Sequence, residues 1–366
     1  MIHFGKISQQ QFLSDYWQKK PLLIKQALPD FISPISPDEL GGLALEPEFE
    51  SRLITGSTES NDWLLRNGPL NEQDFSELPE QDWTLLVQGV DKYIDEVHQL
   101  IRQFDFIPRW RFDDVMISYA ATGGSVGPHF DYYDVFLLQG TGRRRWHLST
   151  QYCNIDNYLK NVPLRIMDKF YEEQVFDVEP GDVLYVPPEV AHHGVSLDDK
   201  CTTLSFGYRH YSANEFFNDI SEKPPKNLAD RKYIDPEWTN TDRPAFIPPA
   251  AIKQAQHLLN ITPQQFAQVV TKLDALDVEK QQIFEYNNQN EAFDANAIYE
   301  LYPIYRVAYL DNNTVFINGE LLVFDGADSE VILNFCNSRM ISASQQPQLA
   351  QQLFKLNLIL LKTFAG

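Results

Sequence analysis

The stretch from Arg111 to Arg209 constrains the fold more than any other part of the chain, because short β-rich runs follow one another there between Gly and Pro turns. The runs are Val115 to Tyr119, Val135 to Gln139, Arg144 to Leu148, Val183 to Val186 and Thr202 to Tyr208. Short strands separated by turn residues are typical of barrels and sandwiches. We therefore expect an all-β barrel or sandwich in the middle of the chain.

Helical patterns lie on both sides of this β-rich stretch. Apolar residues recur at helical spacing from Gln9 to Trp17, and Lys20-Pro21 then leads into a strand-like Leu22-Leu23-Ile24. The pattern turns helical again after Tyr211 and from Ala250 to Phe284, and the Pro- and Asn-rich residues 223–249 predict an irregular connector.

A small terminal module is expected after the polar run Asn287 to Asn290. It begins with a helix, continues with two strands around turns at Asn312-Asn313 and Asn318-Gly319, and closes with a helix from Gln346 to Thr363. The pattern contains no internal repeat.

A histidine and an aspartate spaced two positions apart form the first candidate site, in Gly127-Pro128-His129-Phe130-Asp131. Side chains at this spacing in a strand point to the same face, so His129 and Asp131 would converge on one point inside a barrel. An isolated His-x-Asp more often has a surface or capping role, and a metal site therefore needs a further ligand from elsewhere in the chain.

His192 is the candidate for that further ligand. It follows the strand-like Val183 to Val186 and Pro187-Pro188, so we expect it just past the end of a strand. The segment resembles the second metal motif of cupin-type barrels, with Glu189 where a glycine is usual, and its register selects His192 over His193. Two imidazoles and one carboxylate leave open positions for a chelating co-substrate and O2, which is the arrangement of non-heme Fe(II) oxygenases.

The arginine-rich run from Gly140 to Leu148 supplies a second candidate. Strand alternation places Arg144 on the same face as Trp146, while Arg143 and Arg145 face the other way. A guanidinium on an apolar face is costly unless an anion pairs with it, and its planar fork suits a carboxylate. In a barrel with an iron triad we expect the distal carboxylate of 2-oxoglutarate as that partner; a structural salt bridge is the alternative.

The charge balance excludes several classes of function. Lys and Arg total 30 against 51 Asp and Glu, and the formal net charge of -21 works against direct binding of a phosphate backbone while it permits a basic partner. The three cysteines show no CxxC spacing, and the chain has neither an apolar run of membrane-spanning length nor a signal-peptide pattern. We expect a cytoplasmic protein that binds neither nucleic acid nor membranes.

Further motifs accompany the metal and arginine motifs. They are Trp17-Gln18-Lys19-Lys20-Pro21, Ile35 to Leu40, Asp113 to Ser118, and the segment from Gly127 to Trp146. With these motifs the chain resembles the JmjC-type branch of the 2-oxoglutarate oxygenases, and within it the bacterial ribosomal oxygenases that hydroxylate an arginine of a large-subunit ribosomal protein. The resemblance spans nearly the whole chain, is strongest over residues 111–210 and is weak toward the C-terminus.

The resemblance implies an α+β architecture in which a double-stranded β-helix of the JmjC and cupin kind holds the iron. It implies three parts: a JmjC-type catalytic domain with an N-terminal extension over residues 1–210, a helical dimerisation region with the connector over 211–286, and a winged-helix-like domain over 287–366. A homodimer is expected accordingly. A winged helix often suggests DNA, but the acidic composition argues against that role here.

Within the resemblance, Arg144 matches the arginine form of the residue that holds 2-oxoglutarate, and Ser118 or Thr203 is expected to bond the same co-substrate. Carboxylates near the mouth of the barrel would grip a guanidinium. The candidates for contact with the protein substrate are Tyr132, Tyr133, Asp114 and Ser205. Each of these could equally be a solvated or core-supporting residue.

The function implied is that of an Fe(II)-, 2-oxoglutarate- and O2-dependent protein hydroxylase that acts on an arginine side chain of a large-subunit ribosomal protein. Lysine demethylation is an alternative that would use the same residues. A second alternative is a non-catalytic, cupin-like metal-binding module that serves as an assembly factor.

Overall fold

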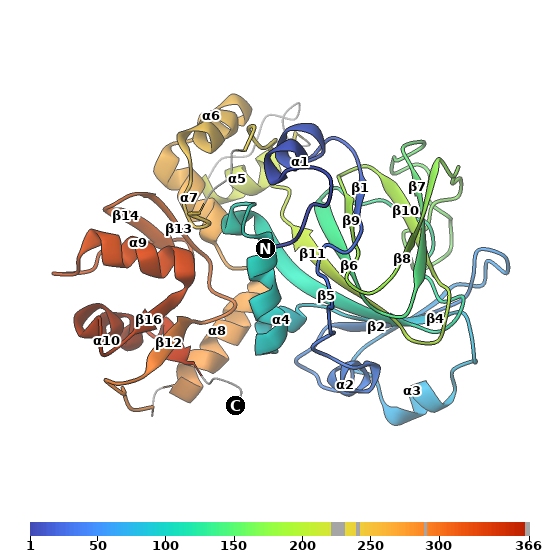
Figure 1. Cartoon of the computed structure of the whole chain (residues 1–366), viewed down its shortest axis with the longest axis horizontal. Helices are drawn as coiled ribbons and strands as arrows, with labels where there is room; N and C mark the ends of the chain where they lie inside the picture. Colours follow the sequence, from blue (N-terminus) through green and yellow to red (C-terminus); the bar gives the residue numbers. More distant parts are fainter. Residues whose placement is uncertain (221–230, 239–241, 289–290, 363–366) are drawn as a thin grey trace. The chain divides into compact units, whose positions relative to one another are not determined.

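The computed structural model describes residues 1–220, 231–238, 242–288 and 291–362 (Figure 1). The chain divides into two compact units. The first comprises Met1–Phe104, Phe112–His210 and Glu237–Asn240, and the second comprises Asp105–Arg111, Tyr211–Pro236 and Thr241–Gly366. The expected division into residues 1–210, 211–286 and 287–366 stays a prediction. No helix within the described residues has both the length and the apolar character needed to span a bilayer.

The first unit is built on two antiparallel sheets. The larger sheet has, among the described residues, the strand order β1-β9-β6-β11-β5-β4-β2-β3. Its strands are β1 (Leu22–Ile24), β2 (Ser51–Thr55), β3 (Leu64–Asn67), β4 (Trp83–Val87), β5 (Phe112–Ala120), β6 (Asp134–Thr141), β9 (Val183–Val186) and β11 (Cys201–Tyr208). The smaller sheet has the order β10-β7-β8, with β7 (Arg144–Ser149), β8 (Gln174–Val178) and β10 (Ala191–Ser196).

The apolar faces of the two sheets meet in a common core. Val135 and Leu137 of β6 belong to the same buried cluster as Trp146 and Leu148 of β7, and Leu184 of β9 completes it from the larger sheet. Figure 1 shows β7, β8 and β10 facing β6 and β9 in agreement with this packing. The interior between the sheets is where the side chains of the candidate sites point.

Short capped helices precede and connect these strands. Helix α1 (Gln9–Asp15) begins at a capping box of Ser8 and Gln11, and α2 (Pro37–Leu43) begins at the equivalent pair Ser36 and Glu39. The remaining helices of the first unit are α3 (Glu72–Ser76), η1 (Val90–Lys92), α4 (Asp95–Leu100) and η2 (Ile101–Phe104). The predicted succession of a helix after Gln9 and a strand at Leu22 to Ile24 is confirmed.

All five predicted β-rich runs form strands, yet two further strands of the β-rich stretch, β8 and β10, were not predicted. The expected position of His192 just past a strand end is wrong, since His192 lies inside β10. The expectation that His129 and Asp131 share a strand is also wrong: His129 forms an isolated bridge with His192, and Asp131 lies in the loop before β6.

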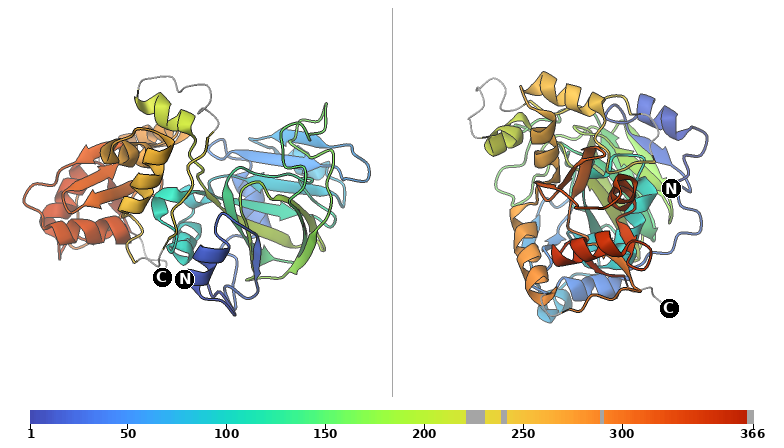
Figure 2. Two further views of the ribbon diagram at one scale, coloured as in Figure 1. Left: turned by 90° about the horizontal axis from the view of Figure 1, so that it is seen from above. Right: turned by 90° about the vertical axis from the view of Figure 1, so that its left-hand side faces the viewer.

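The second unit combines helices with small sheets (Figure 2). Its helices are η3 (Arg109–Arg111), α5 (Ala213–Ile220), α6 (Pro249–Leu258), α7 (Pro263–Thr271), α8 (Ala275–Asn288), α9 (Ser329–Ser338) and α10 (Pro347–Lys355). Its strands are β12 (Ile298–Leu301), β13 (Val307–Asp311), β14 (Thr314–Ile317), β15 (Glu320–Leu322), β16 (Met340–Ser342) and β17 (Ile359–Leu361). The chain is therefore α+β, as expected.

The terminal module differs in part from its prediction. The turns at Asn312-Asn313 and Asn318-Gly319 do separate strands, β13 from β14 and β14 from β15. The predicted closing helix is too long, because α10 ends at Lys355 and the chain then enters β17, which pairs with β12. The predicted opening helix is wrong, because the described residues from 291 lead without a helix into β12, and helix α9 was not predicted. Residues 223–230 and 239–241 of the predicted connector and residues 289–290 of the predicted boundary lie outside the described residues.

Candidate metal and substrate site

His129 and His192 are tied together by the backbone before any metal is considered. The amide of His129 donates to the carbonyl of His192 at 3.1 Å, and the amide of His192 donates back at 2.7 Å. The ring centroids lie 4.3 Å apart. Asp131 follows in the loop, where its carbonyl accepts the amide of Glu189 at 2.8 Å.

The three candidate ligands lie close together. The donor atoms of His129, Asp131 and His192 all lie within 4.8 Å of one another, and no other group of three or more His, Cys, Asp or Glu in the described part of the chain is arranged in this way. The Nε2 of His192 and the Oδ2 of Asp131 are 3.7 Å apart. Two donors bound at right angles to one ion at about 2.1 Å are about 3 Å apart, so a small inward movement suffices to bind an ion.

Both imidazoles keep their Nε2 atom available to bind a metal ion. The Nδ1 of His129 lies 2.9 Å from the carbonyl of Gly127, and the Nδ1 of His192 lies 3.2 Å from the carbonyl of Val190. A carbonyl only accepts, so each Nδ1 carries the proton and each Nε2 keeps its lone pair. Burial and the neighbouring His129 lower the pKa of His192 to about 4, which keeps its imidazole neutral and able to bind a metal at pH 7.

Arg144 points into the same barrel with no anion beside it. Its side chain is 3% exposed, and its Nε and Nη2 have no hydrogen-bond partner. The guanidinium carbon lies 5.5 Å from the ring of Trp146. The alternation predicted for this strand is confirmed, with Arg144, Trp146 and Leu148 buried, and the alternative of a structural salt bridge to Arg144 is not found among the described residues.

Ser118 and Thr203 lie opposite each other on β5 and β11. Both are buried, and the hydroxyl of Thr203 donates to Oε1 of Gln139 at 3.3 Å. Strand alternation puts them on the same face as Met116 and Ser205, although they do not line the pocket that those two residues line. They therefore lie on the interior wall of the barrel.

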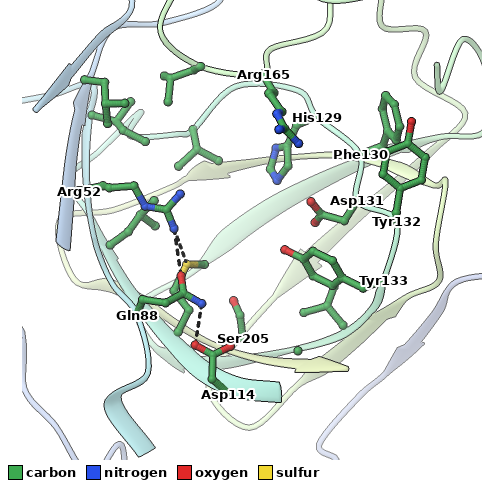
Figure 3. A pocket seen from close by; sticks show the side chains of 18 of the residues that line it. Arg52, Gln88, Asp114, His129, Phe130, Asp131, Tyr132, Tyr133, Arg165 and Ser205 are labelled. Carbon is green, nitrogen blue, oxygen red and sulfur yellow. Dashed lines mark hydrogen bonds between the residues drawn. The ribbon is translucent and has the colours of Figure 1, made fainter. Parts of the chain in front are cut away.

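A pocket of about 670 Å³ opens beside His129 and Asp131 (Figure 3). All four residues expected to contact a protein substrate line it, namely Asp114, Tyr132, Tyr133 and Ser205. Figure 3 shows His129, Asp131 and Tyr133 pointing into one space, with Asp114 and Ser205 together at its far end. The negative charge of Asp131 holds the pKa of the Tyr133 phenol well above its usual range.

Asp114 is the buried carboxylate of this pocket. Its Oδ2 accepts the side-chain amide of Gln88 at 2.6 Å and the backbone amide of Gly89 at 3.0 Å. Burial and the neighbouring Asp113 raise the pKa of Asp114 to about 6, while Lys92 and these hydrogen bonds act in the opposite direction. Asp113, which also lines the pocket, accepts the Nε of Arg209 at 2.9 Å.

Sequence reasoning did not assign a role to four charged or amide residues of the pocket, namely Arg52, Gln88, Asp113 and Arg165. Arg52 lies on β2 and Gln88 directly follows β4, and neither strand was predicted. Arg165 lies in the long connection between β7 and β8, which carries no motif.

Comparison with known proteins agrees with this geometry. The family model described as JmjC domain matches residues 99–216. A protein of Haemophilus influenzae named "Probable ribosomal oxygenase" is 42% identical over 231 residues, which cover 61% of this chain and 56% of that protein. The "Ribosomal protein uL16 3-hydroxylase" of Escherichia coli is 38% identical over 251 residues, which cover 68% of this chain and 65% of that protein. The chain thus spans less than two thirds of the length of these two relatives in the alignments.

Solved structures match over more of the chain. The X-ray structure of ycfD from Escherichia coli is 28% identical with a TM-score of 0.72, and covers 98% of this chain and 99% of its own. The structure of YcfD, "a Ribosomal oxygenase from Escherichia coli in complex with Cobalt and 2-oxoglutarate", is 28% identical with a TM-score of 0.69 over the same shares. The expected JmjC and cupin-like fold is therefore confirmed: residues 99–216 match the JmjC-domain model, and the chain is similar in sequence and fold to the bacterial ribosomal oxygenases.

Proposed function

We propose that this protein is an Fe(II)- and 2-oxoglutarate-dependent oxygenase that hydroxylates an arginine side chain of the large-subunit ribosomal protein uL16. One observation carries the oxygenase part of the proposal: a two-histidine, one-carboxylate cluster and an unpaired buried guanidinium occupy the same barrel. The first suits a metal with open coordination positions, and the second suits a dicarboxylic co-substrate.

In this proposal His129, Asp131 and His192 hold the iron. Their donor set of two nitrogens and one oxygen fits Fe(II), and the carbonyls that accept from both Nδ1 atoms fix the rings in the ligating orientation. Arg144 pairs with the distal carboxylate of 2-oxoglutarate, and Ser118 or Thr203 bonds the same molecule from the opposing wall. A related protein bound to cobalt and 2-oxoglutarate supports the pairing of these two ligands.

The substrate assignment rests on the pocket and on the relatives. Asp114 and Ser205 lie at the end of the pocket where an extended cationic side chain would terminate, and a carboxylate beside a hydroxyl suits the several donors of a guanidinium. The name of the Escherichia coli relative supplies uL16 and hydroxylation, and the chain's charge of -21 favours a basic protein partner.

Bound iron, with 2-oxoglutarate and O2, supplies the oxidising power for inserting one oxygen atom into an unactivated C–H bond. The chain's own residues supply position. Asp114 and Ser205 fix the far end of the side chain, which sets one of its carbons next to the metal cluster. Tyr133 and Phe130 line the pocket close to the cluster and exclude water from it.

The same proposal includes a homodimer formed through the helical region 211–286, a winged-helix-like module over 287–366, and action in the cytoplasm, where a ribosomal protein is available. The homodimer is tested by measuring the oligomeric state of the full chain in solution.

The test of function is a mass measurement. The protein is incubated aerobically with Fe(II), 2-oxoglutarate and purified uL16, and the intact mass and fragments of uL16 are recorded with and without the co-substrate. We expect the gain of one oxygen atom on one arginine, absent with His129→Ala. A uL16 mass that does not change would refute the substrate; succinate formation with another ribosomal protein would then identify a different one.

Lysine demethylation is the second candidate, because relatives named "Bifunctional lysine-specific demethylase and histidyl-hydroxylase NO66" from Aedes aegypti and Drosophila willistoni align with 22% and 24% identity. It predicts formaldehyde release from methyl-lysine peptides. Arginine hydroxylation predicts none.

A further inference from the structure

Three neighbouring strands bring an unusual set of polar side chains to the pocket wall. The larger sheet has β5, β4 and β2 side by side, and these carry or adjoin Asp114, Gln88 and Arg52. Figure 3 shows the three side chains in a row along the wall, with Arg52 near the rim and Asp114 at the end. The Nη2 of Arg52 donates to Oε1 of Gln88 at 3.0 Å, and the Nε2 of Gln88 donates to Oδ2 of Asp114 at 2.6 Å.

The direction of this chain of hydrogen bonds is fixed by chemistry. Arg52 has only donors, so it meets the oxygen of the Gln88 amide, and the nitrogen must then face Asp114. Arg52 and Asp114 thus favour the same orientation of the amide, because the guanidinium only donates and the charged carboxylate only accepts. The flipped amide would turn an oxygen toward a carboxylate, which is repulsive.

Arg52 has no carboxylate of its own. The described residues place no acidic oxygen within salt-bridge distance of it, and its buried Nε has no hydrogen-bond partner. Its Nη2 also donates to the sulfur of Met116 at 3.7 Å. A structural arginine would be expected to pair with one of the many acidic residues, so its placement on Gln88 calls for another role.

The chain of hydrogen bonds from Arg52 through Gln88 to Asp114, called the relay from here on, engages only one of the two carboxylate oxygens of Asp114. Oδ2 accepts from Gln88 and from the Gly89 amide, whereas Oδ1 accepts no hydrogen bond within the described residues. Oδ1 faces Gly207, where an added Cβ would lie 3.6 Å from it, and Gly207 and Ser205 both line the pocket. The missing side chain at Gly207 leaves Oδ1 accessible beside the Ser205 hydroxyl.

The surroundings explain why such help is needed. Asp114 is 8% exposed, and the negative charges of Asp91 and Asp113 act on it, while Lys92 opposes them and Arg209 pairs with Asp113. A carboxylate in that setting is easily neutralised and would then no longer attract a cation. Hydrogen bonds donated by Gln88 and Gly89 favour its charged form.

We propose that Gln88, oriented by Arg52, is a positioning residue that holds the Asp114 carboxylate charged and directs its Oδ1 alone toward the substrate, so that Oδ1 and the Ser205 hydroxyl together select a guanidinium. This deepens the proposed function and rests on its arginine substrate. Gln88 and Arg52 act through Asp114 and touch neither the metal cluster nor Arg144.

The experiment compares Gln88→Met, which keeps the length of the side chain but removes the amide, with Gly207→Ala, which leaves the relay intact but places a methyl group over Oδ1. For both we expect KM for uL16 to rise about tenfold or more with kcat and KM for 2-oxoglutarate near wild type, since a hydrogen bond to a charged group is lost or blocked. Arg52→Leu should give the same signature. Agmatine, a free guanidinium probe, is titrated calorimetrically into each full-length protein without turnover.

The matched control is Gln73→Leu, because it removes an amide donor to a carboxylate at the same 2.6 Å, from Gln73 to Glu77, on the exposed helix α3. It should leave KM and agmatine affinity unchanged. Wild-type KM and agmatine affinity in Gln88→Met would overturn the relay even if uL16 is hydroxylated. Failure of the wild-type protein to oxidise uL16, with agmatine binding lost in Gln88→Met, would instead refute the substrate and support the relay.

Discussion

Replacing Arg144 by methionine should stabilise the ligand-free protein, although most substitutions of a buried side chain do the opposite. Arg144 is 3% exposed, and two of its three guanidinium nitrogens have no partner. A buried ionic group is retained at a cost, and its replacement by an apolar side chain of similar length is stabilising by about 1–4 kcal/mol. Loss of the cation–π contact with Trp146 subtracts about 1 kcal/mol, which leaves a net gain of about 0–3 kcal/mol.

The same substitution should abolish the response to 2-oxoglutarate. A ligand at a hundred times its dissociation constant stabilises the folded protein by about 2.7 kcal/mol. For a unit of this size each kcal/mol corresponds to about 2–4 °C in Tm. Wild type with metal and saturating 2-oxoglutarate should therefore melt about 5–11 °C higher than without 2-oxoglutarate, whereas Arg144→Met should melt higher than wild type without it and show no further rise.

The control is Arg111→Met, which replaces a second buried arginine and should lower the free energy of unfolding. Arg111 is fully buried, and its Nε donates to Oδ2 of Asp235 at 3.1 Å. Its removal leaves the buried Asp235 carboxylate without its guanidinium partner and should cost about 3–5 kcal/mol. Urea denaturation and thermal melting of both variants give the free energies of unfolding. Destabilisation by Arg144→Met of the same size as by Arg111→Met, or a 2-oxoglutarate shift that survives it, would refute the anion site at Arg144.

Three further predictions test other parts of the structure. Burial and the charge of Asp114 raise the pKa of Asp91 to about 7, which is above the value in the unfolded chain. The contribution of Asp91 to stability is therefore present in acid and is lost as the pH rises through 7. In urea titrations, Asp91→Asn should exceed wild type in free energy of unfolding by a margin that grows from about pH 5 to about pH 8. Gly194→Ala places a Cβ within 2.5–2.8 Å of the Trp146 ring, which packs on His192, and should cost about 1–3 kcal/mol of stability on melting together with weaker metal binding. Asp131→Asn should lose the rise in Tm that Mn(II) gives to wild type, and an undiminished rise would exclude Asp131 as a ligand.

The barrel and the convergence of the metal candidates could be predicted because their signals are local. The predicted strands Val115 to Tyr119, Val135 to Gln139 and Val183 to Val186 are largely apolar, and all five predicted strands contain β-branched or aromatic residues. The convergence of His129, Asp131 and His192 was expected from strand periodicity, whereas the structure achieves it by a different route, a backbone bridge between His129 and His192. The pairing of His129 with His192, which are far apart in the sequence, brings the ligands together without the alternation of a regular strand.

The strands that escaped prediction lack these local signals. Strand β8 is largely exposed, and β10 carries two histidines, a glycine and a serine in six residues, so neither alternates clearly between polar and apolar. In the terminal module, Asn357 adopts a left-handed φ of 53°, which ends the helical segment where helical spacing alone predicts continuation. Sheet pairing with distant partners decides all three segments, and a single sequence does not display such pairing.

The strands of the two sheets carry different functional residues. Strand β10 and the loop before β6 carry the candidate metal ligands, and β7 carries Arg144. Strands β4 and β2 follow β5 in the order of the larger sheet, and they bring Gln88 and Arg52 to the pocket. A change in β2 or β4 can therefore alter the environment of Asp114 without moving an atom of the metal cluster. Substrate preference and oxidation chemistry are for this reason separable by mutation. Variants at Arg52 or Gln88 should shift the choice of substrate while metal and 2-oxoglutarate binding persist. Variants at Arg144 should lose 2-oxoglutarate binding while the binding of the guanidinium probe persists.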